Sequence, residues 1–170
     1  MIEIELTQGF VAKIDDDDYE LVSRYKWRVK INKYRYSVKH YAFTQESRKI
    51  GAKGIYMHRL IMDAKKGQDI DHKNHNSLHN RKDNLRECSR SENLANQRKT
   101  RGKSKYKGVI WNKQYQQWQA QICIKQKRIK IGIFATEELA ARAYDGKARE
   151  LFGEYACVNF PKHPNERCAL

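Results

Sequence analysis

Four side chains between residues 71 and 93 are of the types that hydrolysis of a phosphodiester requires: Asp71, His72, Asn84 and Asn93. A histidine can deprotonate water near neutral pH. A divalent cation can stabilise the charge that develops on the phosphate and on the leaving oxygen. Hard cations take oxygen ligands such as carboxylates and amide carbonyls, and magnesium keeps several waters, so two protein oxygens suffice. The segment is therefore a candidate hydrolytic site.

Other histidines and a cysteine lie in the same segment. A zinc site made from His72, His75, His79 and Cys88 is conceivable, but the spacing of these residues fits no standard zinc pattern. His75 and His79 are expected to be solvated or to touch phosphate. None of the four cysteines is paired two residues apart, and no export signal favours disulfides.

The charge of the chain indicates a polyanionic partner. The 170 residues include 35 Lys and Arg against 20 Asp and Glu, which gives a net charge of +15. Such an excess favours nucleic acid or an anionic membrane. No apolar run approaches the length of a membrane-spanning helix, and the N-terminus lacks the features of a signal peptide. We therefore expect no membrane association, and a protein that stays in the compartment where it is made.

The N-terminal segment, residues 1–54, is expected to be rich in strands. Alternation predicts strands at residues 2–6 and 10–14, and aromatic and β-branched residues interleaved with cations predict two more at 26–30 and 34–43. The acidic run from Asp15 to Asp18 resembles a metal site. We interpret it instead as the N-terminal turn of a helix that contains Tyr19, Leu21, Val22 and Tyr25, since acidic residues favour that position.

The middle segment is expected to place the candidate site between two helices. A short helix is predicted from His58 to Ala64, closed by two lysines and Gly67. A second helix is predicted around residues 91–98, capped by Ser89 or Ser91. Residues 98–104 are basic and include no apolar side chain. We predict that they form a linker at a domain boundary.

The segment after the linker has the clearest pattern. Apolar residues alternate with polar or basic ones in two runs, 118–125 and 128–131, separated by a turn at 126–127. This pattern predicts a β-hairpin with one apolar and one basic face, and residues 107–113 are expected to add a third strand. A helix is predicted to begin at Thr136 and to end at Gly153. Its apolar residues should pack on the sheet and leave the basic face open.

Residues 55–97 resemble the HNH nuclease motif, also called ββα-metal. In that family a strand ends in an acidic residue and a histidine, an asparagine follows in a loop, and a third position lies on a helix. The matching residues are Asp71-His72, Asn84 in Asp-Asn-Leu-Arg and Asn93 in Ser-Glu-Asn. The run His58-Arg59-Leu60 fits the sequence that precedes the motif in phage-type and intron-encoded members.

The resemblance implies a role for each of these residues. Asp71 and Asn93 would bind one metal ion, Mg²⁺ or Mn²⁺. His72 would be the general base, and Asn84 would brace the loop and orient His72. Arg59 is a candidate DNA contact. Because the cysteine pairs that hold zinc in some relatives are missing, no structural zinc is expected.

Residues 105–161 resemble the AP2 domain of plant transcription factors and of phage and bacterial homing endonucleases. The matching runs are Tyr106-Lys107-Gly108-Val109, residues 118–122, 128–134 and 140–145, and the ending Val158-Asn159-Phe160-Pro161. Such domains place a three-stranded sheet in the major groove. The candidate DNA contacts are Lys107, Asn112, Gln119, Gln121, Arg128 and Lys130. Plant members carry arginines where this chain has Ile110, Asn112 and Cys123, so their sequence preference does not transfer.

Together these observations predict an α+β protein with a nuclease at 55–97, a linker at 98–104, an AP2-like domain at 105–161 and a tail at 162–170. The two resemblances imply a homing-type endonuclease that cuts or nicks double-stranded DNA, acts as a monomer and works in the cytoplasm of a bacterial or phage-infected cell. The main alternative is a DNA-binding regulator with an inactive nuclease scaffold. A structural RNA-binding protein, suggested by charge alone, is the second alternative.

Overall fold

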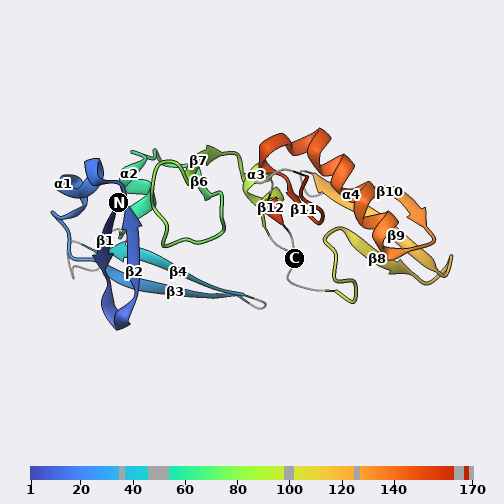
Figure 1. Cartoon of the computed structure of the whole chain (residues 1–170), viewed down its shortest axis with the longest axis horizontal. Coiled ribbons are helices and arrows are strands. Elements are labelled where there is room, and N and C mark those ends of the chain that lie inside the picture. Colours follow the sequence, from blue (N-terminus) through green and yellow to red (C-terminus); the bar gives the residue numbers. More distant parts are fainter. Residues whose placement is uncertain (35–36, 46–53, 98–101, 125–126, 163–166, 169–170) are drawn as a thin grey trace. The chain divides into compact units, whose positions relative to one another are not determined.

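The computed structural model describes residues 1–34, 37–45, 54–97, 102–124, 127–162 and 167–168, and these form an α+β protein with several small sheets and few helices (Figure 1). The predicted fold class is confirmed. The chain divides into two compact units, Met1–Cys88 and Ser89–Leu170. The sequence placed the boundary at 98–104, of which 98–101 lie outside the described residues. The division falls earlier because the helix at Arg90–Ala95 packs within the second unit.

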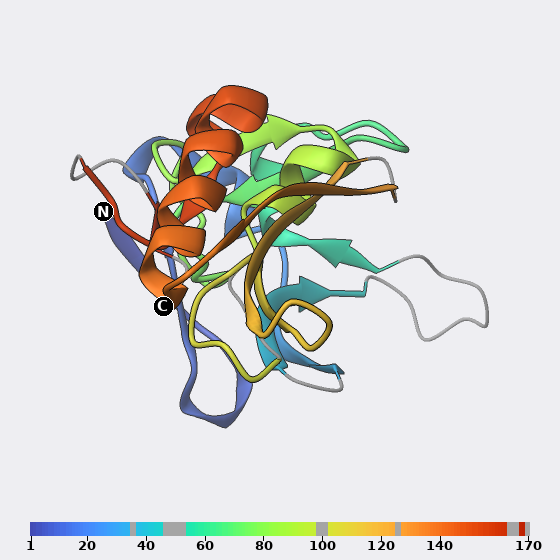
Figure 2. The same ribbon diagram turned by 90° about the vertical axis from the view of Figure 1, so that its right-hand side faces the viewer.

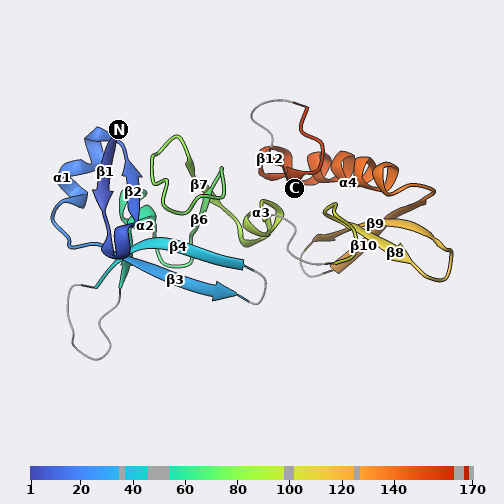
Figure 3. The same cartoon turned by 60° about the horizontal axis from the view of Figure 1, so that its bottom comes forward.

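The first unit consists of three small sheets and two short α-helices. Figure 3 shows its longest strands, β3 and β4, side by side. The pairs β1–β2 and β6–β7 are antiparallel, as is the sheet of order β3-β4-β5. The elements are β1 (Ile2–Glu5), β2 (Val11–Ile14), β3 (Arg28–Tyr34), β4 (Ser37–Thr44), β5 (Ile55–Tyr56), β6 (Asp69–His72), β7 (Leu85–Cys88), α1 (Tyr19–Val22), α2 (Met57–Ile61), and the 3₁₀ turns η1 (Thr7–Gly9) and η2 (Asp16–Asp18).

One hydrophobic core joins the N-terminal strands to the middle segment. It contains Ile14 and Val22 from the first part of the chain, Met57 from α2, and Ile70 and Leu85 from the β6–β7 pair. Strands β6 and β7, which carry the candidate site, therefore pack in the same core as the N-terminal strands. Residues 1–44 supply much of the apolar surface on which they rest.

The acidic run has a different role from the predicted one. Asp15 and Asp18 occupy the N-cap positions of η2 and α1, but neither side chain makes a capping hydrogen bond. The helix that follows is only four residues long and ends before Tyr25. The prediction of a capped helix reaching Tyr25 was wrong because these carboxylates bind cations of a distant loop, described below.

The second unit begins with a short helix and continues with a sheet covered by a long helix. Figures 1 and 2 show α4 lying against the three-stranded sheet of order β10-β9-β8. Its elements are α3 (Arg90–Ala95), β8 (Val109–Asn112), β9 (Gln117–Ile124), β10 (Lys127–Phe134), α4 (Glu137–Phe152), η3 (Gly153–Tyr155), β11 (Cys157–Val158) and β12 (Arg167–Cys168). No helix in the described ranges is long and apolar enough to cross a membrane.

Helix α4 begins and ends where the sequence predicts. The Thr136 side chain accepts a hydrogen bond from the Leu139 amide, and Gly153 ends the helix with a positive φ of 50°. The buried stripe consists of small residues and one aromatic, Ala140, Ala141, Tyr144 and Ala148. Leu139 and Leu151 are exposed. The sheet therefore approaches the alanine face of the helix.

A buried polar node ties the end of the chain to the start of the sheet. The Asp145 carboxylate accepts hydrogen bonds from the backbone amides of Asn159 and Phe160, both at 2.7 Å, and from the Asn159 side chain. The Asn159 side chain in turn bonds the backbone amide and carbonyl of Lys107. Gly108 has a φ of 76°, and a Cβ there would meet the Tyr144 ring at 1.9 Å, so only glycine fits.

Candidate active site

Strands β6 and β7 place two of the predicted site residues. The register of this antiparallel pair sets Asp71 opposite Arg86 and His72 opposite Leu85. Ile70 of β6 and Leu85 of β7 are anchored in the hydrophobic core. Because side chains alternate along a strand, this anchoring fixes the positions of Asp71 and His72. Asp71 and His72 are both buried.

The imidazole of His72 is held by an asparagine that the sequence did not single out. The Nε2 of His72 lies 3.2 Å from the Oδ1 of Asn80, which is buried. The Asn80 Nδ2 donates to the Sδ of Met57 and to the carbonyl of Leu78, so its Oδ1 must be the atom that faces the imidazole. An oxygen of this kind only accepts. Nε2 therefore carries the proton, and Nδ1 is the nitrogen whose lone pair can accept one.

The rings of His58, Tyr41 and Tyr56 cluster with the imidazole of His72; the two histidines are buried and the two tyrosines are half-buried. The rings of His58 and His72 have centroids 5.0 Å apart at 71°, and Tyr41 contacts both. Burial lowers the pKa of His58 to about 3 and that of His72 to about 4. For His72, the Asn80 hydrogen bond and the Asp71 carboxylate oppose this lowering of the pKa, and Lys39 and His79 add to it. Both imidazoles are neutral at pH 7.

Asn84 braces the loop between the two strands. Its Oδ1 accepts from the Asn74 amide at 3.0 Å, and its Nδ2 donates to the His79 carbonyl at 2.7 Å. Its backbone carbonyl also accepts from the Lys73 amide. These bonds cross the loop that contains Asn80. Asn84 therefore acts on His72 through the loop that it braces. The side chain that contacts the imidazole itself is Asn80.

The same loop is fastened to the N-terminal strands. The Asp15 carboxylate accepts from the Arg81 Nε at 2.7 Å and from the Lys82 amide at 2.8 Å, and the Lys82 ammonium lies 2.6 Å from Asp18. The hydrogen bond from Arg81 holds the pKa of Asp15 below its usual value. The backbone amide of Asn80 donates to the Lys13 carbonyl of β2. The N-terminal segment thus positions the loop that orients His72.

Asp71 is paired with a buried guanidinium. The Nε and Nη2 of Arg86 donate to the Oδ2 of Asp71 at 3.0 and 2.9 Å. The side chains are only 7% and 8% exposed. Because both groups lose their hydration on burial, each charge depends on the other for its stabilisation.

Comparisons with known proteins agree with this geometry. Residues 56–95, which include α2, the β6–β7 pair and α3, match the family model described as HNH endonuclease. An uncharacterized HNH endonuclease of Acanthamoeba polyphaga mimivirus is 29% identical over 154 residues, which cover 89% of this chain and 76% of the viral protein. The match and this relative support a nuclease enzyme.

The chain is also similar to plant proteins of the AP2 type. An AP2-like ethylene-responsive transcription factor of Arabidopsis thaliana is 27% identical over 162 residues, or 84% of this chain. An AP2/ERF and B3 domain-containing protein of Oryza sativa subsp. japonica is 45% identical over 58 residues, or 34% of this chain. The chain spans only 29% and 16% of these two plant proteins.

The third predicted position of the HNH domain lies on helix α3. Asn93 is in the middle of this helix, whose start is fixed by a capping box between Ser89 and Glu92. Helix α3 belongs to the second unit, so Asn93 lies in the second unit and Asp71 in the first. The carboxylate and amide oxygens of these two residues have the donor chemistry that Mg²⁺ prefers. Within the described ranges, no three His, Cys, Asp or Glu side chains form a metal-binding group.

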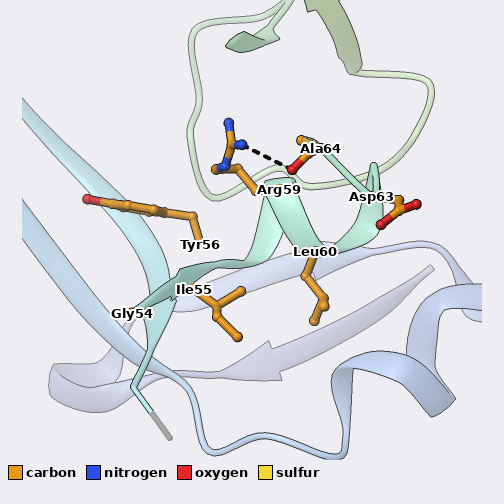
Figure 4. Close-up of a pocket in the computed structure, with 7 residues that line it drawn as sticks. All are labelled: Gly54, Ile55, Tyr56, Arg59, Leu60, Asp63 and Ala64. Atoms are coloured by element: carbon orange, nitrogen blue, oxygen red, sulfur yellow. Dashed lines mark hydrogen bonds between the residues drawn. The ribbon is translucent and has the colours of Figure 1, made fainter. Parts of the chain in front are cut away.

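Arg59 has a structural role in the fold. Its guanidinium donates to the carbonyls of Ala64, Lys65 and Gln68 at 2.6–3.1 Å, and so closes the turn after α2. Figure 4 shows this side chain beside a pocket of the first unit. The pocket is lined by Gly54, Ile55, Tyr56, Arg59, Leu60, Asp63 and Ala64. Neither Asp71 nor His72 lines it.

Lys107 also bonds to the protein. Its ammonium donates to the carbonyls of Ala95, the last residue of α3, and of Gln97, which follows the helix. Burial lowers the pKa of Lys107. The sequence predicted a DNA contact for Lys107, whereas the structure makes it the C-terminal cap of α3.

The other predicted DNA contacts share the open face of the sheet. The register places Asn112, Gln119 and Gln121 on the side opposite Ala120 and Ile122, which are buried against α4. Arg128 and Lys130 follow on β10, across from Cys123 and Gln121. Both cations are exposed, and the Lys130 ammonium lies 5.2 Å from the centre of the Tyr115 ring.

Proposed function

We propose that this protein is a metal-dependent endonuclease that hydrolyses phosphodiester bonds of double-stranded DNA. The observation that carries the proposal is the fixed tautomer of His72: Nε2 donates to Asn80, so the lone pair of the neutral imidazole is on Nδ1. A neutral, oriented imidazole next to an oxygen ligand is what activation of water for attack on phosphorus requires. The HNH domain and the viral relative support the same activity.

In the proposed mechanism His72 takes a proton from water through Nδ1, and the water oxygen attacks phosphorus in line with the 3′ oxygen. The bond from phosphorus to the 3′ oxygen breaks, and the 3′ oxygen takes a proton from solvent. Asn80 stabilises the imidazolium that forms, because its oxygen already accepts from Nε2. Asp71 would supply an oxygen ligand to Mg²⁺ or Mn²⁺, which when bound would stabilise the charge on the leaving oxygen. Arg86 orients Asp71 on its strand through two hydrogen bonds to one carboxylate oxygen. The products would carry a 5′-phosphate and a 3′-hydroxyl.

The second unit is proposed to hold DNA for the nuclease. Similarity to AP2-type plant proteins and the exposed cations of the β8–β10 face support this role. A nuclease domain joined to a DNA-binding module suits a site-specific, homing-type enzyme. With one HNH motif per chain, a monomer would nick one strand.

A second candidate function is a DNA-binding regulator with an inactive nuclease domain. The observation that favours it is the Asp71–Arg86 pair, because a buried guanidinium competes with a metal ion for the same carboxylate. The two functions differ in whether DNA is cut.

Cleavage of supercoiled plasmid carrying a deep library of random inserts tests the proposal. Wild type should nick or linearise the plasmid with Mg²⁺ or Mn²⁺ but not with chelator, and His72→Asn should lose this activity. His75→Asn is the matched control in the same loop, since His75 has a φ of 65° that asparagine adopts readily. Binding of the library without cleavage in either metal would reject the nuclease and support the regulator.

A further inference from the structure

The open face of the β8–β10 sheet carries a row of amide side chains. Asn112 Nδ2 donates to Gln119 Oε1 at 2.8 Å, and Gln119 Nε2 makes a long contact of 3.5 Å with Gln121 Oε1. All three side chains are half-buried and come from positions that face away from α4. We call these three residues the amide row.

The direction of the amide row is fixed at one end. The Asn112 Oδ1 accepts from the backbone amides of Gln114 and Tyr115 at 3.0 and 3.3 Å, so this atom is the oxygen and the other is the NH₂ group. Because Nδ2 then donates to Gln119, the atom it meets must be the Gln119 oxygen. The Gln119 amide nitrogen consequently faces Gln121. Backbone groups of the turn thus orient side chains on the neighbouring strand.

This orientation limits what Gln119 can bind. One N–H of Gln119 faces Gln121 and one lone pair of its oxygen accepts from Asn112. The amide has one further N–H and one further lone pair, and among the described residues neither has a second protein partner. In the major groove adenine presents an acceptor at N7 and a donor at N6, which match this pair. Guanine presents two acceptors there and would leave the Gln119 oxygen without a donor.

Aliphatic side chains lie on both sides of Gln119. The strand register places Ile110 of β8 and Ile133 of β10 directly across from it on the same face. Ile110 is 40% exposed. The thymine of an A·T pair presents a methyl group next to the adenine donor, and apolar side chains contact this methyl favourably. The side chains of Ile110, Gln119 and Ile133 therefore complement an A·T pair. None of the three carries the positive charge with which arginine or lysine binds guanine.

Resting on the proposed function, we propose that the open sheet face selects A·T base pairs in the major groove of double-stranded DNA, with Gln119 as the main specificity-determining residue. Arg128 and Lys130 lie at the β10 edge of this face and supply charge for the phosphates. Among the described residues, neither N–H of the Gln121 amide has a protein acceptor, so both can reach a neighbouring base.

Selection of bound duplexes from a random library, with the full chain in chelator to prevent cleavage, tests this proposal. The selected sites should be enriched in A·T pairs, and changing the pair under Gln119 to G·C should weaken binding about ten-fold. Gln119→Arg should move the preference at that one position to G·C, since arginine donates twice to guanine. Gln114→Arg is the matched control: it adds the same charge in the exposed turn and should tighten binding without changing the selected sequence.

A G·C-rich consensus, or an unchanged consensus in Gln119→Arg, would overturn the proposal. So would binding without base preference in the random library. Plasmid cleavage is measured separately, so the two proposals fail independently. A·T-selective binding without cleavage would reject only the nuclease, and metal-dependent cleavage without base preference would reject only the reading of A·T pairs.

Discussion

The Oδ1 of Asn80 faces the Nε2 of His72 at 3.2 Å, and it can only accept a hydrogen bond because the Asn80 amide nitrogen is engaged by Met57 and Leu78. This relationship assigns the proton of the neutral imidazole to Nε2. It also makes Asn80 a positioning residue, which acts on the reaction through His72.

Replacing Asn80 tests this assignment. Asn80→Leu removes the acceptor and should lower kcat roughly 10- to 100-fold with little change in KM, as for other residues that orient catalytic side chains. Asn80→Asp keeps an acceptor at the same position and should retain more activity than Asn80→Leu. Nitrogen-15 NMR of the imidazole reports which nitrogen carries the proton. A population protonated at Nδ1 in wild type would contradict the assignment.

The pairing of Asp71 with Arg86 predicts a large loss of stability when one partner is removed. Both side chains are buried, so Arg86→Met leaves the carboxylate away from water without its guanidinium, at a cost of about 3–5 kcal/mol in unfolding free energy. The double variant Asp71→Asn, Arg86→Met should recover much of this loss, since no charge is then buried alone. Urea unfolding of the single and double variants measures the coupling. Additive losses would show that the two charges act independently.

The contact between Asp15 and Arg81 predicts that the acidic run controls the site loop. Asp15→Asn weakens the bonds to Arg81 and Lys82, and should destabilise the docked loop by about 1 kcal/mol, a modest value because these side chains are about a third exposed. Faster hydrogen exchange at the Asn80 amide, which bonds Lys13, should report the loosening. Asp17→Asn, an exposed neighbour in the same run, is the matched control and should leave exchange unchanged.

Burial of His58 predicts that acid destabilises the first unit. The folded pKa of about 3 lies below the ordinary value of 6.5, so the unfolded chain binds more protons between these two values. Unfolding free energy should therefore fall as pH drops below 6.5, by up to about 1.4 kcal/mol per pH unit for this residue. His58→Phe removes this contribution, and urea unfolding at pH 7, 6 and 5 should give a shallower slope. An equal slope in both proteins would contradict the burial of a neutral His58.

The sequence predicted the elements whose causes are local. Thr136 caps α4 and Gly153 ends it because capping and left-handed backbone depend on neighbouring residues. The alternation of β9 and β10 likewise identified the open face correctly, since side chains of a strand alternate between its faces.

Contacts between residues distant in the sequence could not be predicted in the same way. Nothing near Asp15 indicates Arg81, which lies 66 residues away. Asn80 was one of several polar residues in a polar loop, and only the fold shows that it is buried against His72. Arg86 could have been found from the pairing of β6 with β7, because that register sets it opposite Asp71.

The two lysine bonds at the end of α3 predict that Lys107 stabilises the second unit without binding DNA. Lys107→Met removes a cation from the carbonyls of Ala95 and Gln97, so the unfolding free energy should fall by about 1–3 kcal/mol. The salt dependence of DNA binding should stay the same, because a lysine bonded to the protein releases no counterions from phosphate. Arg128→Ala is the contrasting variant: this exposed residue on the open face should reduce the salt slope by about one with no loss of stability. A reduced salt slope in Lys107→Met, with stability intact, would instead restore the DNA contact that the sequence predicted.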